Sequence, residues 1–142
     1  MKAEQVILYV DDEFLILDCM RSWLDDWFGQ SHVIEVAESG EEALEVIEEH
    51  LRKGSDLCLV VSDYIMPRMK GDELLTRVRE LSPDTAVIMV TGQIQPDVLS
   101  AASSSLNMFQ CLNKPWSSEE LNAAITAALE ANLAARAASL RL

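Results

Sequence analysis

The chain has 142 residues, of which 24 are acidic and 11 basic, and its formal net charge at pH 7 is −13. This length is typical of one domain, and a core of the size that it permits needs no disulfide framework. The negative charge argues against binding to nucleic acids or anionic membranes, because phosphate contacts need clustered lysine and arginine; it favours cations and basic partners.

The first half of the chain alternates short apolar runs with segments of helical periodicity. The runs Val6–Val10 and Val33–Ala37 predict buried strands. The first run is too short for a signal peptide or a membrane span, so a cytoplasmic protein is expected. The helix between the runs ends at Gly29, and the next begins with a capping box of Ser39 and Glu42. Its apolar stripe comprises Ala43, Val46, Ile47, His50 and Leu51.

The second half continues the same alternation. Further strands are predicted at Leu57–Val61, Ala86–Val90 and Met108–Leu112. A third helix is predicted from about Asp72 to Leu81, since Pro83 disfavours a helical conformation in the residue before it. A weaker helix begins at about Pro96, and its serines at 103–105 predict mobility. The last and longest helix opens with a second capping box and has the stripe Leu121, Ile125, Ala128 and Leu129.

Five strands that alternate with five helices define the α/β class. Because the strands are continuously apolar, we expect a parallel sheet covered by helices on both faces. The flavodoxin-like doubly wound order 2-1-3-4-5 is the predicted topology. No linker or repeat divides the chain, which predicts a single domain.

The cysteines, the histidines and one set of seven acidic residues have simple structural interpretations. Cys19, Cys58 and Cys111 are odd in number and far apart, which predicts reduced, mostly buried thiols. Neither Cys58 nor Cys111 has a cation beside it in the sequence that would lower its pKa. His32 and His50 are predicted at the surface. Seven acids on or beside the second helix predict a solvated face: Glu35, Glu38, Glu41, Glu42, Glu45, Glu48 and Glu49.

Polar residues follow four of the predicted strands at their carboxyl ends. They are Asp11-Asp12-Glu13, Asp63, Thr91-Gly92 and Lys114-Pro115. In the predicted topology these ends are neighbours, so the carboxylates should converge and repel one another unless a cation intervenes. Taken singly, each of these residues is also typical of a turn or a helix cap. Together they favour a hard cation, Mg²⁺, held by oxygen ligands.

The same set predicts a reaction. A carboxylate beside Mg²⁺ and the Lys114 ammonium is arranged to attack phosphorus, which makes Asp63 the candidate nucleophile. The hydroxyl of Thr91 would then bond the new phosphoryl oxygen and turn phosphorylation into a change of shape.

At this point the sequence resembles the receiver domains of two-component response regulators, over about residues 5–131. The residues that carry the resemblance are Val10-Asp11-Asp12-Glu13, Asp63-Tyr64-Ile65-Met66-Pro67 with Met69 and Gly71, Val90-Thr91-Gly92 and Lys114-Pro115-Trp116. The resemblance implies that Asp63 accepts a phosphoryl group from a histidine kinase. It also implies Mg²⁺ ligation by Asp12, by Asp11 through water, by Asp63 and by the backbone carbonyl of Ile65.

The Lys-Pro-Trp ending is similar to a subgroup whose receivers precede a separate output module, often a phosphodiesterase. One departure concerns the aromatic switch position three residues before the lysine, which is Cys111 here. Phe109 lies on the same strand face by alternation and is the candidate substitute.

These features predict a phosphorylation-activated receiver that controls a partner or output domain and is not a metabolic enzyme. Its partners would be a sensor histidine kinase or phosphotransfer protein, with no direct binding to nucleic acid or membrane. One rival is a pseudo-receiver that binds partners without phosphorylation. A phosphatase-type hydrolase would need a second acid where Ile65 stands, and a dinucleotide binder would need a glycine-rich loop after the first strand.

The spacing of the last helix continues beyond Leu129 through Leu133, Arg136 or Ala137, and Leu140. We therefore divide the chain into a receiver domain, 1–131, and an extension, 132–142. Two interpretations stay open for the extension: a coiled coil that forms a homodimer or leads into an output domain, or a frayed alanine-rich tail.

Overall fold

Five parallel strands form one sheet in the order β2-β1-β3-β4-β5, which confirms the predicted α/β topology. The computed structural model describes residues 3–91, 110–113 and 117–140. The predicted helix at Pro96 lies outside these residues. The strands are β1 (Gln5–Val10), β2 (Val33–Ala37), β3 (Asp56–Asp63), β4 (Ala86–Thr91) and β5 (Gln110–Asn113).

The helices begin where the sequence places capping residues. Ser39 Oγ accepts a hydrogen bond of 3.1 Å from the backbone N–H of Glu42, and Ser117 Oγ accepts one of 3.1 Å from Glu120. These bonds satisfy donors that the first turn of a helix leaves unpaired. The described helices are α1 (Phe14–Phe28), α2 (Gly40–Arg52), α3 (Gly71–Leu81) and α5 (Ser118–Leu140).

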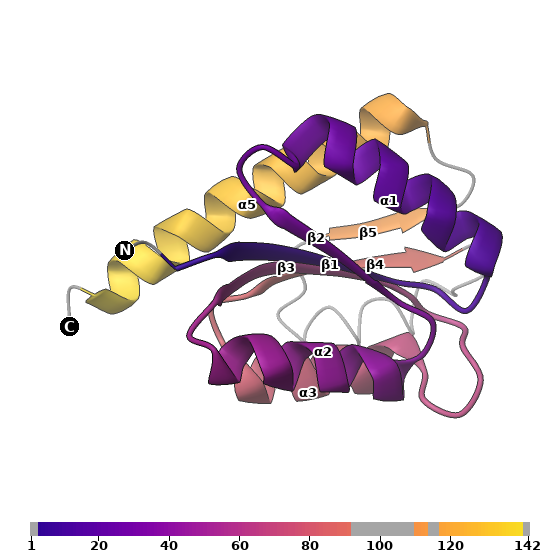
Figure 1. The fold of residues 1–142 in the computed structure, drawn as a ribbon, viewed down its shortest axis with the longest axis horizontal. Helices are drawn as coiled ribbons and strands as arrows, with labels where there is room; N and C mark the ends of the chain where they lie inside the picture. Colours follow the sequence, from indigo (N-terminus) through magenta and orange to yellow (C-terminus); the bar gives the residue numbers. More distant parts are fainter. Residues whose placement is uncertain (1–2, 92–109, 114–116, 141–142) are drawn as a thin grey trace.

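Helices cover both faces of the sheet, with α1 and α5 on one side and α2 and α3 on the other (Figure 1). Successive residues of β1 therefore point into two different apolar layers, which explains why the strand is apolar throughout. The α1/α5 layer includes Ile7, Tyr9, Leu59, Val61, Ile88 and Leu121. The α2/α3 layer includes Val6, Leu8, Val10, Val60, Leu74 and Met89.

The strand order reverses between β1 and β3. The chain passes from β1 outward to β2 and then returns to β3 on the other side of β1. In doubly wound sheets, ligands bind at the carboxyl ends of the strands at such a reversal. The fold therefore favours a site at the ends of β1 and β3.

The predicted surface position of His50 is wrong, because this side chain is only 4% exposed. Its Nε2 lies 2.7 Å from Glu35 Oε2 on β2, and its Nδ1 lies 3.4 Å from Ser55 Oγ. Glu35, predicted on a solvated face, is 35% exposed and contacts His50 from β2. The imidazole is buried because a carboxylate and a hydroxyl provide polar partners on neighbouring elements.

His32 is half-buried, and its ring contacts that of Phe28 edge-on at 6.3 Å between centroids. Burial lowers the pKa of His32, partly offset by the backbone of Phe28. The thiols differ: Cys58 is buried, as predicted, whereas Cys19 is exposed. Among the described helices, none has the length and hydropathy needed to cross a membrane.

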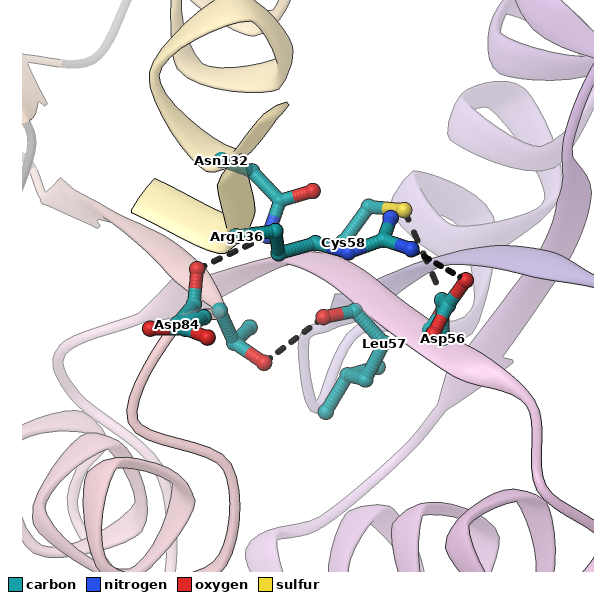
Figure 2. A network of polar contacts seen from close by, with 7 residues as sticks. Asp56, Leu57, Cys58, Asp84, Asn132 and Arg136 are labelled. Carbon is teal, nitrogen blue, oxygen red and sulfur yellow. Dashed lines mark hydrogen bonds and ion pairs between the residues drawn. The ribbon is translucent and has the colours of Figure 1, made fainter. Parts of the chain in front are cut away.

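The last helix continues as a regular helix to Leu140, and its C-terminal part lies against the amino ends of β3 and β4. Asn132 Nδ2 donates a 2.7 Å hydrogen bond to the carbonyl of Asp84, and Arg136 Nη2 lies 2.6 Å from Asp56 Oδ2 (Figure 2). Ser139 Oγ adds contacts of 3.1 and 3.2 Å to the Asp84 carboxylate. We call Asn132, Arg136 and Ser139 with these partners the C-terminal clamp.

The C-terminal clamp also explains the environment of Cys58. Burial raises the pKa of the Cys58 thiol, while the nearby charge of Arg136 acts in the opposite direction. The sequence places no cation next to this cysteine, but the fold brings one from residue 136 (Figure 2). Since burial has the larger effect, the interpretation of Cys58 as a packing residue is unchanged.

Candidate metal centre at the carboxyl edge of the sheet

Three carboxylates gather where β1 and β3 end. One ligand oxygen from each of Asp11, Asp12 and Asp63 lies within 4.8 Å of the others. Asp11 is fully buried and Asp63 is 8% exposed, whereas Asp12 is exposed. We call these three residues the acid cluster.

The strand register explains why residues so distant in sequence meet. Val10 on β1 pairs with Ser62 on β3, so the next residues, Asp11 and Asp63, end adjacent strands at the same level. The backbone N–H of Asp11 continues the strand by bonding the carbonyl of Ala37 at 3.2 Å. Parallel pairing thus fixes the backbone positions of Asp11 and Asp63 independently of their side-chain contacts.

The Asp11 carboxylate is also held by the turn that follows β1. Its Oδ1 accepts a 2.9 Å hydrogen bond from the backbone N–H of Glu13. This contact to the residue two positions later is typical of aspartate in a turn. Asp11 therefore has the turn role that its position indicates and is a member of the acid cluster as well.

Thr91 is at the end of β4 and is fully buried. Asp63 pairs with Val90 across β3 and β4, so Thr91 follows the residue directly opposite Asp63. The predicted phosphorylation and switch residues thus lie on neighbouring strands at the same edge of the sheet.

The segment after Asp63 is fixed closely against the sheet. The backbone N–H of Tyr64 bonds the carbonyl of Val90 at 3.0 Å, and that of Gly71 bonds the carbonyl of Tyr64 at 2.8 Å. A Cβ at Gly71 would stand 2.3 Å from the Asp63 carbonyl oxygen, so only glycine allows α3 to begin this close to the site. Ile65, the predicted carbonyl ligand, lies in this segment with a side chain that is 57% exposed.

Three predicted residues receive no side-chain description. Lys114 and Phe109 lie outside the described residues. Cys111 is on β5, where its backbone pairs with Met89 of β4, but its side chain is outside the description. The residues that the structure brings together are Asp11, Asp12, Asp63 and Thr91.

Large apolar side chains are exposed at positions close in sequence to the acid cluster. Phe14 and Leu15, at the start of α1, are 66% and 81% exposed. They follow Asp12 by two and three positions, and the exposed Ile65 follows Asp63 by two. Apolar groups exposed beside a charged site are typical of surfaces that bind another protein.

Tyr9 is the buried neighbour of the site that sequence reasoning missed. It is 1% exposed, and burial raises the pKa of its hydroxyl, with further increases from the charges of Asp11, Asp63 and Cys19. The sequence could have indicated that Tyr9 is near the site, because alternation along a strand places residues 9 and 11 on one face. Within an apolar run, however, a tyrosine is typical of ordinary core packing.

The donor set of the acid cluster fits a hard divalent cation. Three carboxylates at this separation repel one another, and oxygen ligands are those that Mg²⁺ and Ca²⁺ prefer. The arrangement can therefore hold a cation next to a nearly buried carboxylate, that of Asp63.

Comparison with known proteins gives the family. The model for the response regulator receiver domain matches residues 7–126. The chain is 38% identical over 95 residues, 67% of its length, to a putative transcriptional regulator of Haloferax volcanii. It is 35% identical over 131 residues, 92% of its length, to the sensor kinase CckA of Brucella abortus. It spans 15% and 13% of the lengths of these two relatives.

Solved structures agree with this assignment. A two-component transcriptional regulator AraC from Clostridium phytofermentans is similar with a TM-score of 0.81 and 28% sequence identity. The similarity covers 94% of this chain and 99% of that chain. Fold, sequence and the position of the acid cluster lead to one assignment: the chain belongs to the family of response regulator receiver domains.

Proposed function

We propose that this chain is a phosphoacceptor receiver of a two-component system, in which Asp63 receives a phosphoryl group with the help of Mg²⁺. The acid cluster is the observation that supports this proposal most strongly. It combines a nearly buried carboxylate with two others that favour a cation beside it.

In the proposed reaction a carboxylate oxygen of Asp63 attacks the phosphorus of a phosphohistidine. The new O–P bond forms an acyl phosphate while the P–N bond breaks, and the imidazole leaves with the bonding electron pair and takes up a proton. Asp63 is 8% exposed and stands at a fixed strand end, so its carboxylate is oriented before the donor arrives.

The proposed ligands of Mg²⁺ are Asp12, Asp63, the carbonyl of Ile65 and, through water, Asp11. A bound Mg²⁺ would neutralise charge on the transferring phosphoryl oxygens. Lys114 would provide a second positive charge. Asp11 is fully buried and held by Glu13, whereas Asp12 is exposed, which is consistent with different tasks for the two.

The proposed readout starts at Thr91. Its hydroxyl would donate to a phosphoryl oxygen on Asp63, from the neighbouring strand, and so bias the segment that follows β4. Phe109 is the proposed aromatic partner of this movement in place of Cys111.

The proposed phosphodonor is a sensor histidine kinase or a phosphotransfer protein. The exposed side chains of Phe14, Leu15 and Ile65, close in sequence to the acid cluster, favour a protein donor, because a partner can bury exposed apolar groups. The relatives above are named as a sensor kinase and as transcriptional regulators. We accordingly propose control of an output domain or partner protein, in the cytoplasm, rather than metabolic catalysis.

We also retain the proposed division into a receiver domain, 1–131, and an extension, 132–142. The C-terminal clamp ties residues 132, 136 and 139 to the sheet, which favours an extension that moves with the receiver. A homodimer through this helix is proposed with it.

The decisive experiment is incubation with Mg²⁺ and acetyl phosphate, followed by intact-mass measurement. We expect one added phosphoryl group on the wild type and none on Asp63→Asn. Asp26→Asn, at an exposed carboxylate of α1, is the matched control and should be modified like the wild type. A wild type that stays unmodified, with histidine phosphodonors as well, would contradict the proposal and favour a pseudo-receiver.

A further inference from the structure

Tyr9 places a polar group in the core where a purely packing residue would have none. The side chain is 1% exposed, and its hydroxyl has no hydrogen-bond partner among the residues that the structure describes. A buried polar group without a partner destabilises a fold. Phenylalanine would fill nearly the same volume without this cost, so the hydroxyl needs an explanation other than packing.

The strand register places Tyr9 two residues before Asp11, on the same face of the sheet. Tyr9 on β1 pairs with Val61 on β3, and both belong to the α1/α5 layer. Because side chains alternate along a strand, Asp11 and Asp63, each two residues farther along, start from the same face of the sheet. The charges of both carboxylates act on the Tyr9 hydroxyl.

Asp11 is the carboxylate best placed to use this donor. It is fully buried, and the N–H of Glu13 bonds its Oδ1 from the side of the turn. A second donor from the core would fix the carboxylate from another direction. Carboxylates that serve metal sites are in general held by such hydrogen bonds.

We propose that Tyr9 is a positioning residue of the acid cluster, whose hydroxyl donates a hydrogen bond to the Asp11 carboxylate through one buried water molecule. The water would accept from Tyr9 and donate to Asp11, which gives the Tyr9 hydroxyl a partner. Tyr9 thereby holds Asp11 in the orientation that favours a divalent cation. The inference rests on the proposed function of the acid cluster.

The test is Tyr9→Phe in the full chain, with Mg²⁺ affinity measured by isothermal titration calorimetry. We expect the Mg²⁺ dissociation constant to rise about tenfold, the lower end of what the loss of an outer hydrogen bond to a metal ligand causes. The thermal midpoint without Mg²⁺ should stay close to that of the wild type, because phenylalanine fills nearly the same volume in the core. A merely structural role of Tyr9 would lower the midpoint and leave the dissociation constant unchanged.

Ile7→Val is the matched control, since Ile7 is fully buried on the same strand and face but bears no polar group. An unchanged dissociation constant in Tyr9→Phe, or an equal rise in both variants, would overturn the inference. Phosphorylation of the wild type by acetyl phosphate tests the proposed function separately from the role of Tyr9. A wild type that binds Mg²⁺ and is never phosphorylated contradicts the function, while the comparison of dissociation constants still decides the role of Tyr9; a wild type that binds no Mg²⁺ overturns both.

Discussion

At the scale of single residues, repulsion within the acid cluster destabilises the metal-free fold and favours the binding of a cation. Three carboxylates with ligand oxygens within 4.8 Å repel one another, and a cation bound only by the folded state relieves this repulsion. We expect Mg²⁺ at about 100 times its dissociation constant to stabilise the wild type by about 2.7 kcal/mol, a shift of several degrees in thermal midpoint. Asp12→Ala should lose most of this shift and melt higher than the wild type in EDTA.

Differential scanning fluorimetry with Mg²⁺ and with EDTA measures the thermal midpoints of both proteins under the two conditions. Asp26→Ala removes an exposed carboxylate from α1, far along the chain from the acid cluster, and should keep the full response to Mg²⁺. An Asp12→Ala variant that responds as strongly as the wild type would contradict the assignment of Asp12 as a ligand.

Most of the described site was predictable because its members follow strand ends. Asp11, Asp12, Asp63 and Thr91 each come directly after or at the end of an apolar run, and parallel pairing brings such ends together. Tyr9 was missed because sequence alone does not distinguish an aromatic residue inside a strand from core packing. Only the structure shows that its hydroxyl has no partner among the described residues.

The contact between His50 and Glu35 is a second feature that the sequence pattern did not predict. Each residue alone is typical of a surface, and 15 positions separate them. Only the packing of α2 on β2 brings their side chains to 2.7 Å, where each satisfies the other. A polar residue that is buried against a partner from another element cannot be identified from its own hydrophobicity.

At the scale of elements, the strands and the starts of the helices were predictable, whereas the role of the α5 extension was not. The runs of apolar residues and the capping serines are local signals. The C-terminal clamp instead joins Asn132 to Asp84 over 48 positions and Arg136 to Asp56 over 80. The spacing beyond Leu129 allows Arg136 or Ala137 as a coiled-coil position, yet the Arg136 guanidinium contacts Asp56 on the chain's own sheet.

The C-terminal clamp predicts that the extension contributes to the stability of the receiver. Asn132 is 2% exposed and donates to the Asp84 carbonyl, so Asn132→Ala should lower the free energy of unfolding by about 1–3 kcal/mol. Glu130→Ala, at an exposed position of the same helix, should change it by less than about 0.5 kcal/mol. Urea unfolding followed by circular dichroism measures both, and equal effects would mean that the clamp does not stabilise the domain.

At the scale of the whole molecule, a net charge of −13 opposes the approach of two copies. The exposed face at the end of α5 is nevertheless largely uncharged: Leu133 is 55% exposed, and Ala134, Ala137 and Ala138 are exposed beside it. If two copies associate through this face, contact brings apolar groups together while the remaining charges repel. Salt screens the repulsion and leaves the apolar contact, so the proposed homodimer should strengthen as ionic strength rises.

Sedimentation velocity over a range of protein concentrations, at low and at high NaCl, tests this prediction. We expect the weight-average mass to increase with concentration, and at lower concentrations in high salt. Leu133→Asp should abolish the increase, because it places a carboxylate at the centre of the contact. Leu81→Asp, which adds the same charge at a 44% exposed leucine at the end of α3, should associate like the wild type. A monomer at every concentration and salt would contradict dimerisation through α5, as would equal losses in the two variants, because net charge alone would then govern association.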